Sequence, residues 1–203
     1  MTETSSSPWT LDDARELYSV DVWGDGFFSI NDQGNVSVRP IEDNPELRID
    51  INDVVAEALE SGSTLPLLVR FQDIISSRVR RLNRKFREAI EAAGYDGSYR
   101  SIFPIKVNQL QEVVAEVMEA GREFNNGIEC GSKAELMAAL PLIGSETLLL
   151  CNGVKDHVML TLMLNAQQLG QQVVPIIEKY SEFEQLMILA DQRQMSPRLG
   201  VRV

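Results

Sequence analysis

Lys106 is the residue whose setting most favours covalent chemistry, because it follows the apolar, strand-like run Ile102–Ile105 and precedes a helical pattern. An amine attacks an aldehyde only when it is unprotonated, and burial disfavours the ammonium form of lysine. We expect Ile102, Ile105 and Val107 to bury Lys106 and make it a Schiff-base lysine for an aldehyde such as pyridoxal phosphate. The plainer interpretation is a lysine at a strand end whose amine extends into solvent.

Two other polar residues share this kind of position. Glu129 and Asn152, like Lys106, fall at or just beyond the end of a strand-like run. In barrels of parallel strands the reactive groups lie at the carboxyl ends of the strands. The sequence therefore predicts that these side chains meet at one edge of a sheet, where a catalytic site would be built.

The second half of the chain alternates short β-rich runs with helical patterns. Five strand-like runs recur at intervals of about 23 to 26 residues and lack polar alternation, which indicates parallel strands buried on both faces. After the first run, the expected strands are Phe124–Cys130, Thr147–Cys151, Val173–Ile177 and Arg198–Val203. The helices between them are expected to end at Gly121, to break at Pro141, to end near Gly170 and to run from Ser181 to about Gln192.

This rhythm predicts an α/β fold, and a (β/α)8 barrel fits it best. The alternative is an open doubly wound sheet, but no Gly-x-Gly-x-x-Gly fingerprint follows the first strand. Pro104 inside that strand is a mild objection, because proline cannot donate a ladder hydrogen bond.

A complete barrel needs about 250 residues. We therefore expect residues 99–203 to be the first half of a barrel and the chain to be the N-terminal part of a longer protein. The 203 residues alone are expected to be inactive. They are also expected to aggregate, because an unclosed sheet exposes a strand edge.

The first half of the chain follows a different pattern. We expect a disordered tip over residues 1–10, then a β-rich lead-in with an amphipathic helix over residues 11–98. Trp23–Ile30 and Val36–Arg39 indicate a hairpin, and Leu65–Phe71 a further strand. The basic run Arg78–Arg87 has apolar residues at helical spacing, so it is expected to be the solvated face of a packed helix.

Composition limits the partners. Acidic residues outnumber basic ones and the formal net charge is -11, so we expect no nucleic-acid and no membrane partner. No apolar run approaches the roughly 18 residues needed to cross a bilayer, and residues 1–8 lack the features of a secretory signal. Cys130 and Cys151 have no spacing typical of a metal site or disulfide framework, so reduced thiols and a cytoplasmic location are expected.

Several longer segments carry a family signature: Phe103–Gln109, Gly127–Leu136, Cys151–Asp156 and Leu199–Val203, with Val22–Phe28 and Pro66–Phe71 upstream. In this order they resemble segments of biosynthetic arginine decarboxylases, the bacterial and plant enzymes built on an alanine-racemase-like barrel. The resemblance covers nearly the whole chain after about residue 10. It implies a partial pyridoxal-phosphate-binding (β/α)8, TIM-like barrel preceded by a β-rich N-terminal segment, whose early strands pair with a C-terminal β-domain in such proteins.

The resemblance also implies site residues. Lys106 would bind the cofactor as a Schiff base until the substrate amine displaces it, and the ring would then accept electrons as the α-carboxylate leaves as carbon dioxide. Glu129 matches an acidic position near the cofactor, and Arg202 matches an arginine directed at the ring hydroxyl. Glu135 is a candidate cofactor-binding residue, but Ser132–Glu135 is also a capping box. Arg202 fits an ion pair inside the barrel equally well.

The implied activity is conversion of L-arginine to agmatine and carbon dioxide in polyamine (spermidine) biosynthesis and arginine catabolism, by a homo-oligomer when full length. Mg²⁺ is a further family expectation, without a visible ligand cluster. The phosphate-binding loop and the residues that recognise the substrate are expected beyond Val203.

Three alternatives remain open. The first is a decarboxylase for another basic amino acid, ornithine or diaminopimelate. The second is a non-catalytic or regulatory protein that retains the fold. The third is a cofactor-carrier protein of the simple barrel type, although such proteins lack a β-rich lead-in like residues 20–71.

Overall fold

The computed structural model describes residues 8–203. It divides into two compact units, residues 1–77 and 78–203. The disordered tip expected for residues 1–10 lies outside the described residues as far as residue 7, and Thr10 is the N-cap of the first helix. The sequence-based boundary between residues 98 and 99 stays a prediction.

The first unit holds a small antiparallel sheet and three helices. The strands are β1 (Phe28–Ile30), β2 (Val36–Val38) and β3 (Ile49–Asp50), and the helices are α1 (Leu11–Tyr18), α2 (Val20–Trp23) and α3 (Ile51–Glu60). β1 pairs with β2 and β2 with β3. The expected hairpin is therefore confirmed, although its first strand is shorter than predicted because Trp23 belongs to α2 and residues 24–27 form a turn before β1.

The strand expected over Leu65–Phe71 is wrong: these residues have no regular structure. Their apolar composition gave the prediction, but no strand of the described chain pairs with them, and Leu65 and Leu68 are exposed. A strand depends on ladder hydrogen bonds to a neighbour, so β propensity alone does not form one.

The expected amphipathic helix is α4 (Gln72–Ala93), which contains the sequence boundary between the two units, after Ser77. Its apolar stripe is only partly covered, since Leu82 and Phe86 are exposed. Within the second unit, Phe86 stacks on Tyr99 with ring centroids 3.8 Å apart. The guanidinium of Arg87 lies 4.9 Å from the centroid of the Phe124 ring.

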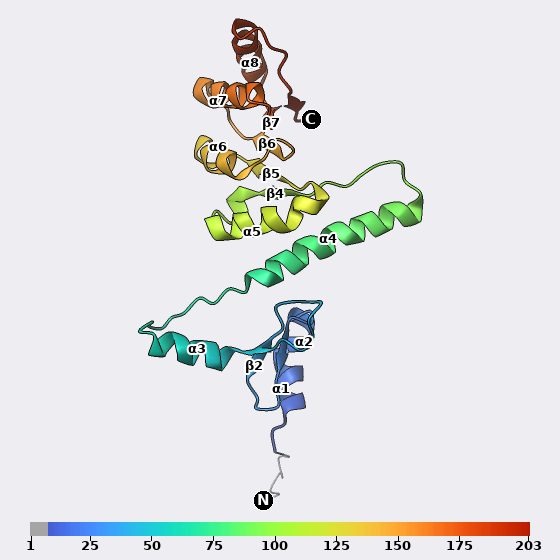
Figure 1. The fold of residues 1–203 in the computed structure, drawn as a ribbon, viewed down its shortest axis with the longest axis vertical. Helices are drawn as coiled ribbons and strands as arrows, with labels where there is room; N and C mark the ends of the chain where they lie inside the picture. Colours follow the sequence, from blue (N-terminus) through green and yellow to red (C-terminus); the bar gives the residue numbers. More distant parts are fainter. Residues whose placement is uncertain (1–7) are drawn as a thin grey trace, which may run out of the picture. The chain divides into compact units, whose positions relative to one another are not determined.

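The second unit is built on a parallel sheet of five strands in the order β4-β5-β6-β7-β8 (Figure 1). The strands are β4 (Ile102–Pro104), β5 (Gly127–Cys130), β6 (Leu148–Asn152), β7 (Gln172–Ile177) and β8 (Gly200–Val201). Each new strand joins the same edge, as in a barrel, whereas a doubly wound sheet reverses its strand order. The partial barrel is confirmed and the doubly wound alternative is not.

A helix follows each of the first four strands. These helices are α5 (Gln111–Gly121), α6 (Lys133–Ala139), α7 (His157–Gln168) and α8 (Tyr180–Gln192), with short 3-10 turns η1 (Ile105–Val107), η2 (Arg122–Phe124) and η3 (Leu140–Leu142). Alternate strand residues pack against them in the main core, including Ile128, Leu149 and Val173. The residues between these, such as Glu129 and Leu150, face the opposite side of the sheet and are half-buried.

Candidate active site at the carboxyl ends of the strands

The strand register aligns the candidate residues in rows across the sheet. Glu129 pairs with Pro104 on one side and with Leu150 on the other. Asn152 pairs with Ile176, and Ile176 with Gly200. Because alternate residues of a strand share a face, these residues lie on the face that the helices leave open. The structure therefore brings Glu129 and Asn152 to one face, as the sequence predicts.

Lys106 lies just past the carboxyl end of β4, in the turn η1. The expected burial of its side chain is wrong. The 3-10 turn buries Ile105, which is 2% exposed, but leaves Val107 71% exposed, and Lys106 is exposed as well. The tight turn replaces strand alternation here, so apolar neighbours in the sequence do not surround the amine. The position at the strand end agrees with the prediction; the apolar environment does not.

Three polar groups at this edge have no partner among the described residues. Across residues 8–203, the Lys106 amine and the Glu129 carboxylate have no hydrogen-bond or ion-pair partner. The Oδ1 atom of Asn152 is buried and also lacks a partner. Buried polar atoms are normally hydrogen-bonded, so an unmatched acceptor at the same sheet edge as a free carboxylate and a free amine is a lining that a polar ligand could complete.

Two glycines allow neighbouring loops to approach closely at this edge. A Cβ atom on Gly153 would lie 2.2 Å from the carbonyl oxygen of Gly131, and one on Gly200 would lie 2.6 Å from Cδ1 of Ile176. Any side chain at either position would force the backbone or its neighbour to move. These residues therefore keep the loops after β5 and β6 in contact, and keep β8 close to β7.

Glu135 is the third residue of α6, whose N-cap is Ser132. Its Oε2 atom accepts a hydrogen bond of 2.7 Å from the backbone N–H of Gly131. Its Oε1 atom accepts one of 2.9 Å from the side-chain amide of Gln109. Glu135 thus connects the segment that follows Lys106 to the loop that follows Glu129. Ser132 Oγ also accepts the backbone N–H of Glu135 at 3.2 Å. The Glu135 carboxylate binds the N–H of Gly131 and not that of Ser132, so only half of the predicted capping box forms.

Arg202 follows β8, and its backbone N–H donates to the carbonyl oxygen of Ile177. Its guanidinium Nη1 lies 3.1 Å from Oε1 of Glu178, the residue that follows β7. The predicted ion pair is therefore present. The Arg202 side chain is 65% exposed, so the pairing leaves part of the guanidinium accessible on the open side of the sheet.

A series of polar side-chain contacts joins the successive loops at this edge. Gln109 contacts Glu135, Lys133 contacts Asp156 at 2.5 Å, Lys155 contacts Glu182 at 3.2 Å, and Glu178 contacts Arg202. Each contact spans from one strand's loop to the next. The hydrogen bond from Lys133 and the backbone N–H of Met159 hold the pKa of Asp156 below its ordinary value.

The Lys155–Glu182 contact is buried, whereas the other three are exposed on at least one side. Neither residue lies in a local sequence pattern that predicts this contact. A lysine between Val154 and an aspartate resembles any surface loop. The helix expected from Ser181 begins one residue earlier, at Tyr180, and its N-cap Lys179 makes no side-chain hydrogen bond.

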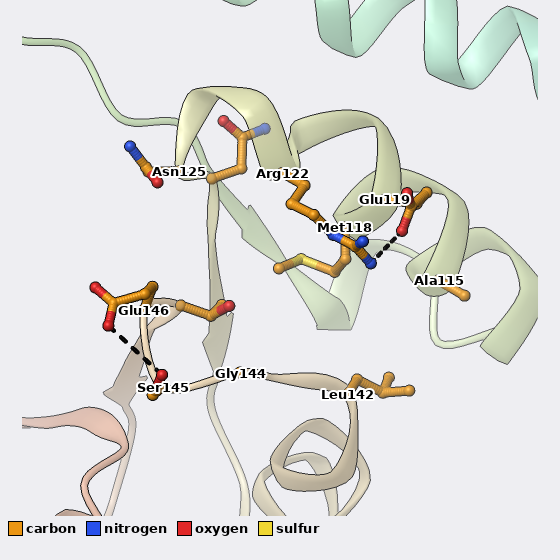
Figure 2. A pocket seen from close by; sticks show the side chains of 11 residues that line it. Ala115, Met118, Glu119, Arg122, Asn125, Leu142, Gly144, Ser145 and Glu146 are labelled. Atoms are coloured by element: carbon orange, nitrogen blue, oxygen red, sulfur yellow. Dashed lines mark hydrogen bonds and ion pairs between the residues drawn. The ribbon is translucent and has the colours of Figure 1, made fainter.

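A separate cavity of about 620 Å³ lies at the opposite, amino-terminal end of the strands (Figure 2). It is lined from α5 and from the loops that precede β5 and β6. Arg122 is paired there with Glu119, and Ser145 contacts Glu146 (Figure 2). None of the candidate site residues lines this cavity.

The two cysteines occupy matching positions on neighbouring strands. Cys130 pairs in register with Cys151, and their sulfur atoms are 3.4 Å apart. Both thiols are free and buried against the helices. The hydrogen bond with Cys130 and burial raise the pKa of the Cys151 thiol.

Among residues 8–203, no three histidine, cysteine or acidic side chains converge in a way that could hold a metal ion. No helix within the same residues combines the length and the apolar character that a membrane span requires.

The chain is similar in sequence to known bacterial proteins. It is 41% identical over 203 residues to the biosynthetic arginine decarboxylase of Rhodopirellula baltica and 43% identical over 197 residues to that of Alkalilimnicola ehrlichii. These matches cover 100% and 97% of this chain, but the chain spans only about 30% of the length of the curated relatives it matches. No family model matches.

A solved structure of a protein with the same name also matches this chain. The crystal structure of the biosynthetic arginine decarboxylase of Campylobacter jejuni superposes with a TM-score of 0.82 at 30% sequence identity. The match covers 91% of this chain and 30% of that one. The similarity thus includes both the sequence and the arrangement of the elements that carry the candidate site.

Proposed function

Because this chain is related over nearly its whole length to part of the biosynthetic arginine decarboxylases, we propose that it is the N-terminal part of a pyridoxal-phosphate-dependent enzyme that converts L-arginine to agmatine and carbon dioxide. The observation that carries the proposal is that Lys106 and Glu129 of this related chain lie past the end of β4 and near the end of the adjacent strand β5. This is the edge at which barrels place their catalytic groups.

The residues at this edge fit a pyridoxal group. The exposed amine of Lys106 is accessible to an aldehyde, and Glu129 and Asn152 offer unmatched acceptors on the open face. The Arg202 guanidinium could donate hydrogen bonds to the phenolic oxygen of the pyridoxal ring. Bound pyridoxal phosphate supplies an electron-accepting ring for the decarboxylation.

The chain's own residues would then act around that ring. Lys106 would anchor it and could return a proton, since its amine has no competing partner in the described chain. Glu129 would place a negative charge beside the ring, and Glu135 would hold the Lys106 segment through Gln109. Arg202 would stabilise an oxygen anion on the ring while Glu178 keeps the guanidinium in place.

Several finer properties stay proposals that rest on the family resemblance of the sequence: a role in polyamine (spermidine) biosynthesis, arginine catabolism, a homo-oligomeric assembly and a cytoplasmic location. Mg²⁺ has no further support, because the described residues offer no ligand cluster. A small-molecule amino acid substrate is consistent with the net charge of -11, which disfavours nucleic acid.

The experiment is substrate competition on the full-length protein. The loaded enzyme is incubated with equal concentrations of arginine, ornithine and diaminopimelate, and the amine products are separated by mass spectrometry. We expect agmatine as the dominant product. Dominance of either other amine would reassign the substrate, and the absence of any amine from a protein loaded with pyridoxal phosphate would contradict the decarboxylase proposal.

A further inference from the structure

The buried carboxylate of Glu182 is the centre of a network at the carboxyl edge of the sheet. Its Oε1 atom accepts the backbone N–H of Lys155 at 3.0 Å, and its Oε2 atom accepts the backbone N–H of Glu178 at 3.2 Å. The Lys155 ammonium lies 3.2 Å from Oε2. The two side chains are 0% and 5% exposed. One carboxylate thus binds the loop after β6 and the loop after β7 at the same time.

The ammonium of Lys155 has a second partner. Its Nζ atom donates to the carbonyl oxygen of Gly153 at 2.5 Å. A buried charge is tolerated when its partners are both ionic and hydrogen-bonded, and it then fixes local geometry strongly. Burial opposes ionisation of Glu182, but the hydrogen bonds from Lys155 and Glu178 outweigh it and lower the pKa of the carboxyl. The Glu182 carboxyl is therefore ionised at neutral pH.

The network is connected to Arg202 through Glu178. The backbone N–H that Glu182 holds belongs to Glu178, and the side chain of Glu178 is the partner of the Arg202 guanidinium at 3.1 Å. Arg202 is otherwise exposed and its long side chain has many rotamers. Its direction therefore depends on where the Glu178 carboxylate lies, and that in turn depends on Glu182.

We propose that Glu182 is a positioning residue for the cofactor site: by fixing Glu178 it directs the Arg202 guanidinium toward the open face of the sheet. This inference rests on the proposed function, because it takes the cofactor ring to be the group that Arg202 meets. Glu182 itself touches neither cofactor nor substrate. Its effect on cofactor binding passes through Arg202.

The test is a double-mutant cycle in the full-length apoprotein, with the dissociation constant for pyridoxal phosphate as the readout. We expect Glu182→Gln to weaken binding by roughly tenfold, equivalent to ~1.4 kcal/mol. In an Arg202→Ala background the same change should weaken binding by less than about twofold, because its route to the cofactor is already removed. Effects that multiply, or no effect of Glu182→Gln alone, would overturn the proposal.

Glu184→Gln is the matched control, because Glu184 is exposed on the same helix and the same type of charge is lost. It should leave the dissociation constant unchanged. If Glu182→Gln does not accumulate as folded protein, Lys155→Met with Glu182→Gln removes both buried charges together, which buried pairs tolerate better than the loss of one. The double variant then takes the place of Glu182→Gln in the cycle. Its effect on the dissociation constant should again be about tenfold with Arg202 present and less than about twofold in the Arg202→Ala background, and effects that multiply would again overturn the proposal.

Hydrogen exchange in the apoprotein separates this inference from the proposed function. Glu182→Gln should speed exchange at the N–H groups of Glu178 and Arg202, and Glu184→Gln should not. A wild-type protein that never loads pyridoxal phosphate contradicts the proposed function and the cofactor part of this inference together. A wild type that loads the cofactor while exchange at Glu178 is unchanged in Glu182→Gln contradicts the inference alone.

Discussion

Glu135 and Glu182 occupy equivalent positions in two βα units of the sheet. Each is the third residue of the helix that follows its strand, and each accepts the backbone N–H of the residue just before that helix's N-cap. The second oxygen of each carboxylate then binds a neighbouring loop, through Gln109 for Glu135 and through Lys155 for Glu182. The fold thus uses the same helix-start carboxylate twice to join adjacent loops at the candidate site.

The Glu135–Gln109 contact should matter for cofactor binding. Glu135→Ala removes two acceptors and frees the segment that carries Lys106. We expect the dissociation constant of the full-length protein for pyridoxal phosphate to rise about tenfold, the equivalent of one hydrogen bond to a charged group at ~1.5 kcal/mol. Titration of the apoprotein measures it. Glu112→Ala, on the exposed start of α5, is the control, and an equal effect of the two changes would contradict the role of Glu135.

The buried pair should be important for stability. Lys155→Met leaves the Glu182 carboxylate buried without its counter-charge, and breaking one side of such a pair destabilises a fold by ~3–5 kcal/mol. The unfolding midpoint of the full-length protein should fall clearly, as followed by circular dichroism. Lys133→Met, which breaks the exposed contact with Asp156, should change it little. Equal midpoints for the two variants would show that the buried pair contributes no more than a surface one.

Low pH should weaken the contact between Lys155 and Glu182. The lowered pKa of Glu182 means that its ionised form is favoured in the folded state. Its contribution is complete above the ordinary value of 4.5 and is lost as the pH falls below 4.5 and through the lowered pKa. We expect the difference in unfolding midpoint between wild type and Glu182→Gln to shrink as the pH is lowered from about 7 to about 3. A difference that stays constant would exclude this carboxyl as the titrating group.

The paired thiols should be unreactive in the folded protein. Cys130 and Cys151 are buried, and the raised pKa of Cys151 keeps its thiol protonated. The thiolate is the reactive form, so iodoacetamide should label neither residue in the native full-length protein and both after denaturation. Peptide mapping by mass spectrometry measures the labelling. Rapid native labelling of either cysteine would show that this part of the core opens.

The parallel sheet could be predicted because its signal is local and repeated. Apolar runs such as Val173–Ile177, followed by helices with clear stop residues, define βα units without knowledge of distant contacts. The positions of Glu129 and Asn152 at the candidate edge follow from these runs. Leu65–Phe71 shows the limit, since an apolar run becomes a strand only when a partner strand is present.

The details of the candidate site could not be predicted in the same way. The exposure of Lys106 depends on a 3-10 turn that the sequence pattern does not indicate. The Lys155–Glu182 pair joins residues that are 27 positions apart, so it emerges only when β6 and β7 lie side by side. The only local feature of the sequence that indicates this pair is the acidic residue at the third position of the helix, Glu182. Ordinary helix caps have an acidic residue at the same position, so this feature does not identify the pair.

Reduction of the cofactor adduct tests the central claim most directly. The full-length protein is incubated with pyridoxal phosphate and reduced with borohydride, and the modified peptide is identified by mass spectrometry, with Lys106→Ala as the control. We expect one pyridoxyl label within the peptide that contains Lys106, and loss of that label in Lys106→Ala. An unlabelled wild-type protein, or a label that persists on another lysine such as Lys133, would contradict the assignment of Lys106 and with it the proposed function.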